Sequence, residues 1–189
     1  MKKRLISFDP VAHYSAKILI LGSMPGIQSL NARQYYAHKQ NAFWKIMAEL
    51  TGLNPDAPYT ERLNTLIASG IALWDVLNSC EREGSLDNAI KLNSIRPNDF
   101  GSFFRNHSQL ELICFNGSLA ERCFMSHVLP TLNNSIPYVR LPSTSPAHAT
   151  LSILEKVTAW REIIEPKLSY TTLDKSFIFS EKCDDSAVL

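Results

Sequence analysis

The chain has 189 residues, of which 45% are hydrophobic and 20% are charged. This composition excludes a disordered tail, a low-complexity scaffold and a strongly basic histone-like protein. The length suits one domain, which we expect over residues 1–168, followed by a C-terminal tail over residues 169–189. The net charge is +1, but residues 1–50 hold seven Lys or Arg against two Asp or Glu, so the N-terminal part is basic.

The four cysteines include no C-x-x-C pair, which argues against a zinc site or a redox dithiol and favours free, buried thiols in a reducing compartment. The N-terminus lacks the apolar core of a signal peptide, and no window approaches 18 consecutive apolar residues. The sequence therefore predicts a cytoplasmic protein that does not contact a membrane.

Short apolar runs bounded by turn residues predict buried strands, at residues 17–22, 70–75, 110–115 and 136–141. Because these runs are continuous and do not alternate, they suit parallel strands that are covered on both faces. Helical patterns occupy residues 41–50, 61–69, 117–129 and 151–168. The order predicts an α/β fold, a three-layer α/β/α sandwich around a central, mostly parallel four-stranded sheet.

Ligands of open parallel sheets bind beyond the carboxyl ends of the strands. The first predicted strand ends in a loop that we call the first loop, made of Gly22, Ser23, Met24, Pro25 and Gly26. Two glycines so close together suit a close approach of backbone to a ligand, but also an ordinary turn. The adjacent Tyr35 and Tyr36 lie in a basic stretch, where they form a stacking platform for a nucleobase or fill the core.

These residues carry a family resemblance. The first loop, followed by Tyr36-Ala37-His38 and by Asn41-Ala42-Phe43-Trp44, resembles the first motif of the uracil-DNA glycosylase superfamily. Residues 70–77 are similar to the superfamily's strand that ends in a base-reading Asn, and residues 141–146 are similar to its late loop. The landmarks occur in family order and cover most of the chain, so together they are specific.

The departures from the pattern point to one branch. Met24 stands where many branches have a catalytic Asn or Asp, Leu141 stands where they have a late His or Asn, and Asp75 replaces the base-reading Asn. This combination, with residues 80–87, is most similar to the sixth branch, the hypoxanthine-DNA (deoxyinosine) glycosylases. The resemblance implies a uracil-DNA glycosylase-like fold and a monofunctional hydrolase of base excision repair. It implies no cofactor and no metal, because the cysteine spacing of the iron–sulfur branches is absent.

The resemblance also implies the site. It places catalysis on Asn41 and stacking of the base on Tyr36. The residues expected at the base are Gly22, Ser23, Met24, Pro25, Gly26, Tyr36, Phe43, Asp75 and Asn116. A carboxylate only accepts hydrogen bonds, so Asp75 suits the N1–H of hypoxanthine and equally the N3–H of uracil. The alternatives are a helix cap or a structural hydrogen bond for Asp75, and a turn residue for Asn116.

The late loop, residues 142–148, offers polar groups for DNA phosphates, expected from Ser143, Thr144, Ser145 and His148. For His148, the alternatives are a contact with the leaving group during catalysis and a purely structural role. The expected partner is double-stranded DNA with a damaged base, bound by a monomer that associates with the nucleoid through DNA. A basic N-terminal part in a nearly neutral chain suits a grip on a few phosphates around one flipped nucleotide.

The expected reaction is hydrolysis of the N-glycosidic bond of a deaminated base, with hypoxanthine preferred. Because the first loop holds no acidic residue, the reaction must depend on leaving-group stabilisation and positioning. The alternatives are a mismatch-type uracil or thymine glycosylase and a non-catalytic nucleotide-binding α/β domain. A serine or cysteine hydrolase is disfavoured because the sequence has no G-x-S-x-G elbow.

Overall fold

A computed structural model describes residues 4–132 and 136–168, so the predicted tail lies outside the described residues. Its central sheet has four strands in the order β3-β2-β6-β7, and every neighbouring pair is parallel. The strands are β2 (Ile18–Gly22), β3 (Ile71–Asp75), β6 (Leu112–Asn116) and β7 (Tyr138–Leu141). The predicted α/β fold is therefore confirmed, with a sheet that is parallel throughout.

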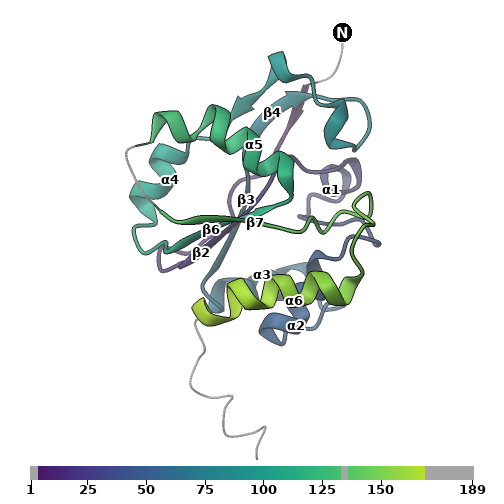
Figure 1. Cartoon of the computed structure of the whole chain (residues 1–189), viewed down its shortest axis with the longest axis vertical. Coiled ribbons are helices and arrows are strands. Elements are labelled where there is room, and N and C mark those ends of the chain that lie inside the picture. The colour runs from purple at the N-terminus through teal and green to yellow at the C-terminus, as the bar shows by residue number, and fades with distance from the viewer. Residues whose placement is uncertain (1–3, 133–135, 169–189) are drawn as a thin grey trace, which may run out of the picture.

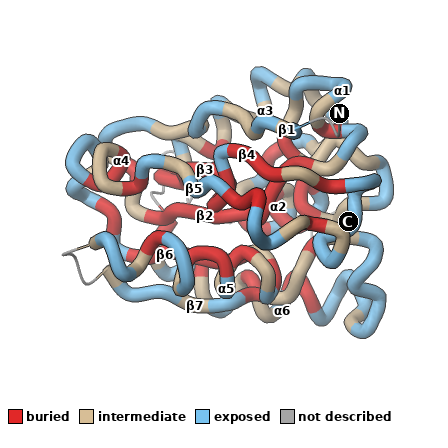
Figure 2. The backbone as a smooth tube through the Cα atoms, turned by 90° about the horizontal axis from the view of Figure 1, so that it is seen from above, coloured by how far each residue is buried: buried red, intermediate tan, exposed pale blue. Residues whose placement is uncertain are grey.

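Helices cover both faces of this sheet (Figure 1). On one face lie α2 (Phe43–Thr51), α3 (Tyr59–Ala68) and α6 (Ile153–Ile164). On the other face lie α4 (Phe100–Asn106) and α5 (Ser118–His127), and the short α1 (Ile27–Ala32) follows β2 at the carboxyl edge. Strands β2 and β3 are buried along their whole length, whereas the helices of the outer layers have both buried and exposed residues (Figure 2). This is the three-layer sandwich that the sequence predicts.

Alternate residues of each central strand point to opposite layers, as the pleat requires. In β2, Ile18 and Ile20 pack in one core with Trp160 of α6, whereas Leu19 and Leu21 pack in the other core with Phe124 of α5. Both faces of the strand are thus apolar. The continuous apolar run in the sequence has its physical cause in this double burial.

Two contacts tie the helices of one layer to the late loop. Trp160, fully buried, donates its indole N–H to the Pro142 carbonyl at 2.9 Å. The backbone N–H of Ala42, at the start of α2, donates to the Thr144 carbonyl at 2.9 Å. The packing of α2 and α6 therefore determines where the late loop lies.

A second, antiparallel sheet, which the sequence did not predict, has the order β1-β4-β5. Its strands are β1 (Arg4–Ile6), β4 (Leu77–Glu81) and β5 (Arg96–Pro97). These strands are short and partly exposed, so they lack the long apolar runs that reveal the central strands. Helices α1 and α4 were also not predicted. Among the described residues, no helix has both the length and the apolar character needed to cross a membrane.

Candidate active site

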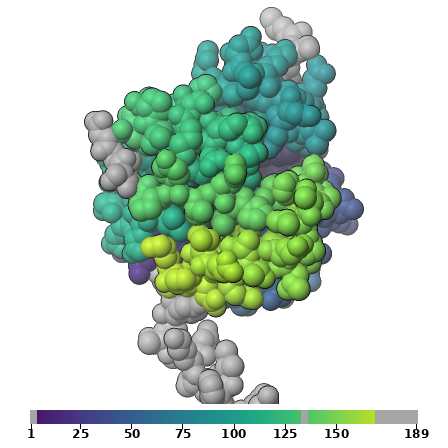
Figure 3. Space-filling view, in the orientation of Figure 1, coloured from purple at the N-terminus to yellow at the C-terminus, as the bar shows by residue number. Residues whose placement is uncertain are grey.

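The carboxyl ends of the central strands open into a cleft of about 770 Å³, a size typical of small-molecule sites. The loops around it occupy the right-hand side of Figure 1, and Figure 3 shows the green late loop on the surface there. All predicted site residues except Phe43 line this cleft. They are Gly22, Ser23, Met24, Pro25, Gly26, Tyr36, Asn41, Asp75, Asn116, Ser143, Thr144, Ser145 and His148.

The floor of the cleft, as we define it, consists of Gly22, Tyr36 and Asp75. Gly22 ends β2 and pairs in register with Asp75 at the end of β3. A Cβ atom at position 22 would overlap Oδ1 of Asp75 and would lie 3.1 Å from the Tyr36 hydroxyl oxygen. Only glycine therefore lets the carboxyl group and the phenol approach the backbone at this point.

Asp75 is 3% exposed, and its two carboxylate oxygens differ in their surroundings. Ser7 donates its hydroxyl to Oδ2 at 2.7 Å, whereas Oδ1 lies next to Gly22. The pKa of Asp75 is raised from 3.8 to about 7: burial is the largest cause, Asp87 adds to the rise, and the Ser7 hydrogen bond and Arg82 oppose it. The carboxyl group therefore titrates near neutral pH. No described helix begins at Asp75, so the cap alternative does not apply.

Tyr36 lies over Phe43, with ring centroids 4.0 Å apart and an interplanar angle of 20°. Phe43 is fully buried, so it supports Tyr36 from behind and does not line the cleft; its predicted place at the base is corrected. Tyr36 has a φ of +55°, a left-handed conformation that costs free energy for a non-glycine residue. Its buried hydroxyl has no hydrogen-bond partner among the described residues, and burial raises its pKa.

Tyr35 has a different environment from its neighbour. It is 3% exposed, its hydroxyl donates to the Asp9 carbonyl at 3.2 Å, and its carbonyl accepts the indole N–H of Trp44 at 3.0 Å. One of the two adjacent tyrosines thus belongs mainly to the core, and the other, Tyr36, is less buried and lines the cleft.

Asn41 lies just before α2, half-buried in the cleft wall. Its Oδ1 accepts the backbone N–H of Phe43 at 3.0 Å, which fixes the orientation of the side-chain amide. Among the described residues, Nδ2 has no hydrogen-bond partner, so this group remains for a ligand or a water molecule.

Asn116 at the end of β6 is bound to the late loop through both ends of its amide. Its Nδ2 donates to Thr144 Oγ1 at 2.9 Å, and its Oδ1 accepts the Thr144 backbone N–H at 2.8 Å. Thr144 is 1% exposed, so this pair forms the inner support of the loop, and the predicted contact of Thr144 with a DNA phosphate is corrected. The outer part of the loop, which includes His148, is exposed.

A segment that we call the brace, residues 82–87, holds the first loop from outside. Buried Arg82 donates through Nη2 to the Pro25 carbonyl. Ser85 Oγ accepts the backbone N–H of Ile27 at 3.0 Å, and Ser23 Oγ donates to Asp87 Oδ1 at 2.8 Å. Sequence reasoning cited residues 80–87 only for their family resemblance, and no local pattern signalled these contacts.

Lys156 on α6 is a second feature that sequence reasoning missed. Its ammonium donates to the His148 carbonyl at 2.7 Å, and the residue is only 5% exposed. With Lys45 it borders a smaller groove of about 260 Å³ beside the late loop. An ammonium has three donors, so Lys156 retains donors for an anion after binding this carbonyl.

Open parallel α/β sheets bind their ligands at the carboxyl edge, and an aromatic ring, a buried carboxyl group and a polar rim at that edge are the groups with which base-flipping enzymes hold an extruded nucleobase. Residues 9–164 match the family model described as the Uracil DNA glycosylase superfamily. The chain therefore belongs to that superfamily, which confirms the predicted family.

Relatives and a solved structure agree with this membership. The chain is 40% identical over 114 residues to a protein of Methanosarcina acetivorans named hypoxanthine DNA glycosylase, a match that covers 60% of this chain and 71% of the relative. It is 39% identical over 118 residues to a protein of the same name from Methanosarcina barkeri, covering 62% and 72%. A solution NMR structure of a candidate uracil DNA glycosylase from Methanosarcina acetivorans matches with a TM-score of 0.72 and 33% identity, over 87% of this chain and 98% of that chain.

Proposed function

We propose that this protein is a DNA glycosylase that hydrolyses the N-glycosidic bond of a deaminated base in double-stranded DNA, with hypoxanthine preferred, and that it acts as a monomer. The observation that carries the proposal is a buried carboxyl group beside an aromatic ring at the floor of the cleft. Two relatives named hypoxanthine DNA glycosylase support the choice of base.

Base recognition requires the damaged nucleotide to leave the duplex and enter the cleft. Tyr36 stacks on the base with the ring face that Phe43 does not cover, a contact worth about 1–3 kcal/mol. Oδ1 of Asp75 accepts the N1–H of hypoxanthine, because a carboxylate has acceptors and no donor. The first loop lines the same cleft, and its backbone N–H groups are the donors for the acceptor atoms of the base.

The chemical step breaks the bond between C1′ of the sugar and the base nitrogen. The bonding electron pair leaves with the base, and a water oxygen forms the new bond to C1′ of an oxocarbenium-like sugar. The proton that this water loses balances the one that the departing base gains at its nitrogen. The first loop offers Met24 where a carboxylate would activate water, so stabilisation of the departing base is the main contribution of the protein. Nδ2 of Asn41 contributes to the reaction by polarising the departing base or by orienting the water.

The rim of the cleft binds the phosphates beside the extruded nucleotide. Ser143, Ser145 and His148 line the cleft at the rim, and Lys156 lies directly behind the His148 carbonyl. Phosphate contacts of this kind orient the DNA without reading its sequence. A grip on a few phosphates makes the affinity decrease with salt.

The test uses duplexes that each contain one deoxyinosine, deoxyuridine or deoxyxanthosine, incubated with excess protein and then cleaved with alkali at abasic sites. We expect product from the deoxyinosine duplex, and a loss of at least about a hundredfold in the Asn41→Ala variant, the scale of removing one such group from an active site. The exposed neighbour Gln40→Ala is the matched control.

Uracil is the second candidate base, since its N3–H beside O4 presents the same donor and acceptor to Asp75 as N1–H and O6 of hypoxanthine. Product mainly from the deoxyuridine duplex would move the assignment to the uracil or thymine branch. A protein that binds DNA but yields no product from any of the three duplexes would be a non-catalytic binding domain.

A further inference from the structure

The N-terminal segment 7–11 runs beside β3 and reaches the floor of the cleft. Its backbone is held at several points: Ser7 N–H donates to the Asn78 carbonyl at 2.8 Å, and Val11 N–H donates to the Leu73 carbonyl at 2.9 Å. The Trp74 indole N–H donates to the Phe8 carbonyl at 3.1 Å. The position of Ser7 relative to β3 is therefore fixed by the backbone, and its hydroxyl is directed at Asp75.

The contact between Ser7 and Asp75 makes the two carboxylate oxygens different. The Ser7 hydroxyl donates to Oδ2 at 2.7 Å, while Oδ1 lies next to Gly22, and both Gly22 and Asp75 line the cleft. A hydroxyl that donates to Oδ2 favours the ionised carboxylate. In that state Oδ1 is an acceptor with no proton to offer.

We propose that Ser7 is a positioning residue for base recognition, which occupies Oδ2 of Asp75 so that Oδ1 remains a pure acceptor facing the base. The inference rests on the proposed function and extends it to a residue outside the cleft. Its consequence is selectivity for deamination. Hypoxanthine has an N1–H that Oδ1 accepts, whereas adenine has a lone pair at N1 that would face a second acceptor.

The same geometry distinguishes uracil from cytosine, because uracil has a hydrogen at N3 and cytosine a lone pair. Guanine also carries an N1–H, so this contact separates a deaminated base from its parent and does not exclude guanine. Opposite a parent base with a lone pair, Oδ1 of Asp75 would be left without a donor, and an unpaired polar group in a buried site is costly. This cost favours the deaminated base.

Other titratable groups surround Asp75 and determine its charge together with Ser7. Tyr36 and Tyr35 approach from the segment before α2, Tyr59 from α3, and Asp87 and Arg82 from the brace. Asp87 disfavours ionisation of Asp75, and Arg82 favours it. Among the neighbours that lower the pKa of Asp75, Ser7 alone hydrogen-bonds its carboxylate in the described structure.

The first arm of the test needs no DNA. The Asp75 carboxyl carbon is titrated by ¹³C NMR in the wild-type chain and in Ser7→Ala, Ser7→Thr and Ser79→Ala variants. We expect the midpoint to rise by on the order of one pH unit in Ser7→Ala, the scale of one hydrogen bond to a charged group. Ser7→Thr, which keeps the hydroxyl, is expected to restore it. Ser79→Ala removes a buried hydroxyl on β4 that accepts a hydrogen bond from Arg4. This control is expected to leave the Asp75 midpoint unchanged.

The second arm measures single-turnover release from the deoxyinosine duplex between pH 5.5 and 9. A shift of one unit would make Ser7→Ala about fivefold slower than wild type at pH 7 and equal to it at pH 9. An Asp75 titration that is the same in Ser7→Ala and wild type would overturn the inference, as would a rate loss that is equal at every pH. If no duplex yields product from wild type, the proposed function fails, while the NMR titration still decides the role of Ser7.

Discussion

The floor and the rim of the cleft differ in how the protein holds its polar groups. At the floor, Asp75 is 3% exposed and bound by Ser7, and Gly22 leaves no space between the carboxyl group and the backbone. At the rim, residues 146–148 are exposed, and the support comes from Thr144 and Lys156 behind them. Electrostatic contacts are strong at the enclosed floor and screened at the wet rim, so the floor suits recognition of a base and the rim suits orientation of the DNA.

The largest expected effect comes from filling the floor. In Gly22→Ala the new Cβ atom would overlap Asp75 Oδ1 and crowd the Tyr36 hydroxyl, so both groups must move. A displacement of about 1 Å in a catalytic site costs about a hundredfold in rate. Single-turnover release from a deoxyinosine duplex measures this. The matched control is Gly26→Ala, where the new Cβ atom would meet only Ser85, at 3.6 Å or more. This control should retain activity. Equal losses in both variants would contradict a special role of the floor.

Removing the charge at the floor is expected to have the next largest effect. Asp75→Asn keeps the shape but replaces an acceptor by an amide, and the loss of one charge-assisted hydrogen bond corresponds to about a 10- to 100-fold lower rate. Because the pKa of Asp75 is about 7 and the ionised form accepts N1–H, wild-type release should rise with pH through this value. The Asn variant should show no such rise, and an unchanged pH profile would assign the titration to another group.

The same substitution tests what the floor costs in stability. The folded pKa of Asp75, about 7, lies above its ordinary value of 3.8, so the folded state binds its proton more tightly than the unfolded state. The contribution of Asp75 to the free energy of unfolding therefore falls as pH rises from about 4 to about 7. We expect Asp75→Asn to raise Tm at pH 8 and to have a smaller effect at pH 5. Calorimetry at the two pH values measures this; a lower Tm at pH 8 would refute it.

Tyr36 separates stacking from hydrogen bonding at the floor. Tyr36→Ala removes a stacking face worth about 1–3 kcal/mol, which corresponds to roughly 5- to 150-fold in affinity for lesion DNA. Tyr36→Phe keeps the ring and removes a buried hydroxyl that has no partner within the described structure, so its Tm should be equal or higher. Fluorescence anisotropy and thermal unfolding measure the two effects. A Phe variant as weak as the Ala variant would show that the hydroxyl, and not the ring face, binds the base.

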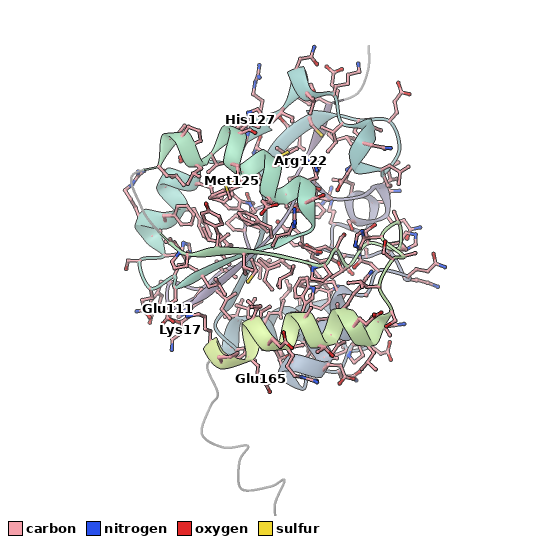
Figure 4. The ribbon with its side chains drawn as sticks, in the orientation of Figure 1. Lys17, Glu111, Arg122, Met125, His127 and Glu165 are labelled. Atoms are coloured by element: carbon pink, nitrogen blue, oxygen red, sulfur yellow. The ribbon has the colours of Figure 1, made fainter. Side chains whose placement is uncertain are left out.

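The rim should give the smallest effect and the clearest dependence on salt. Lys156→Met removes an ammonium beside the late loop and is expected to weaken DNA binding about two- to fivefold at low salt, with a slope against log salt that is smaller by about one. Lys17→Ala is the control, because Lys17 precedes β2 at the opposite end of the sheet, where Figure 4 labels it. If the slope of DNA affinity against log salt fell equally in Lys156→Met and Lys17→Ala, the rim would contribute no more to DNA binding than a lysine at the far end of the sheet.

Much of this protein was predictable from local patterns. The central strands appear as continuous apolar runs because both of their faces are buried, and the polar residues that follow these runs must lie together at one edge because the strands are parallel. Gly22, Asp75 and Asn116 end such runs and were therefore expected at one edge, while the family resemblance added Tyr36 and Asn41; the structure places all five in the cleft wall. Phe43 was misplaced because a spacing in the sequence does not say which of two stacked rings faces the ligand.

Only the tertiary structure decided how those groups are held. Ser7 and Asp75 are 68 residues apart, Pro25 and Arg82 are 57 apart, and Ser23 and Asp87 are 64 apart. The small antiparallel sheet that brings Ser7 to the floor consists of short, partly exposed strands with no periodic signal. Hydrophobic periodicity specifies which residues are buried within an element, whereas a hydrogen bond between distant segments depends on the path of the whole chain. The sequence thus determined the layers of the fold and the edge that bears the site, and the packed chain determined the partner of each polar group there.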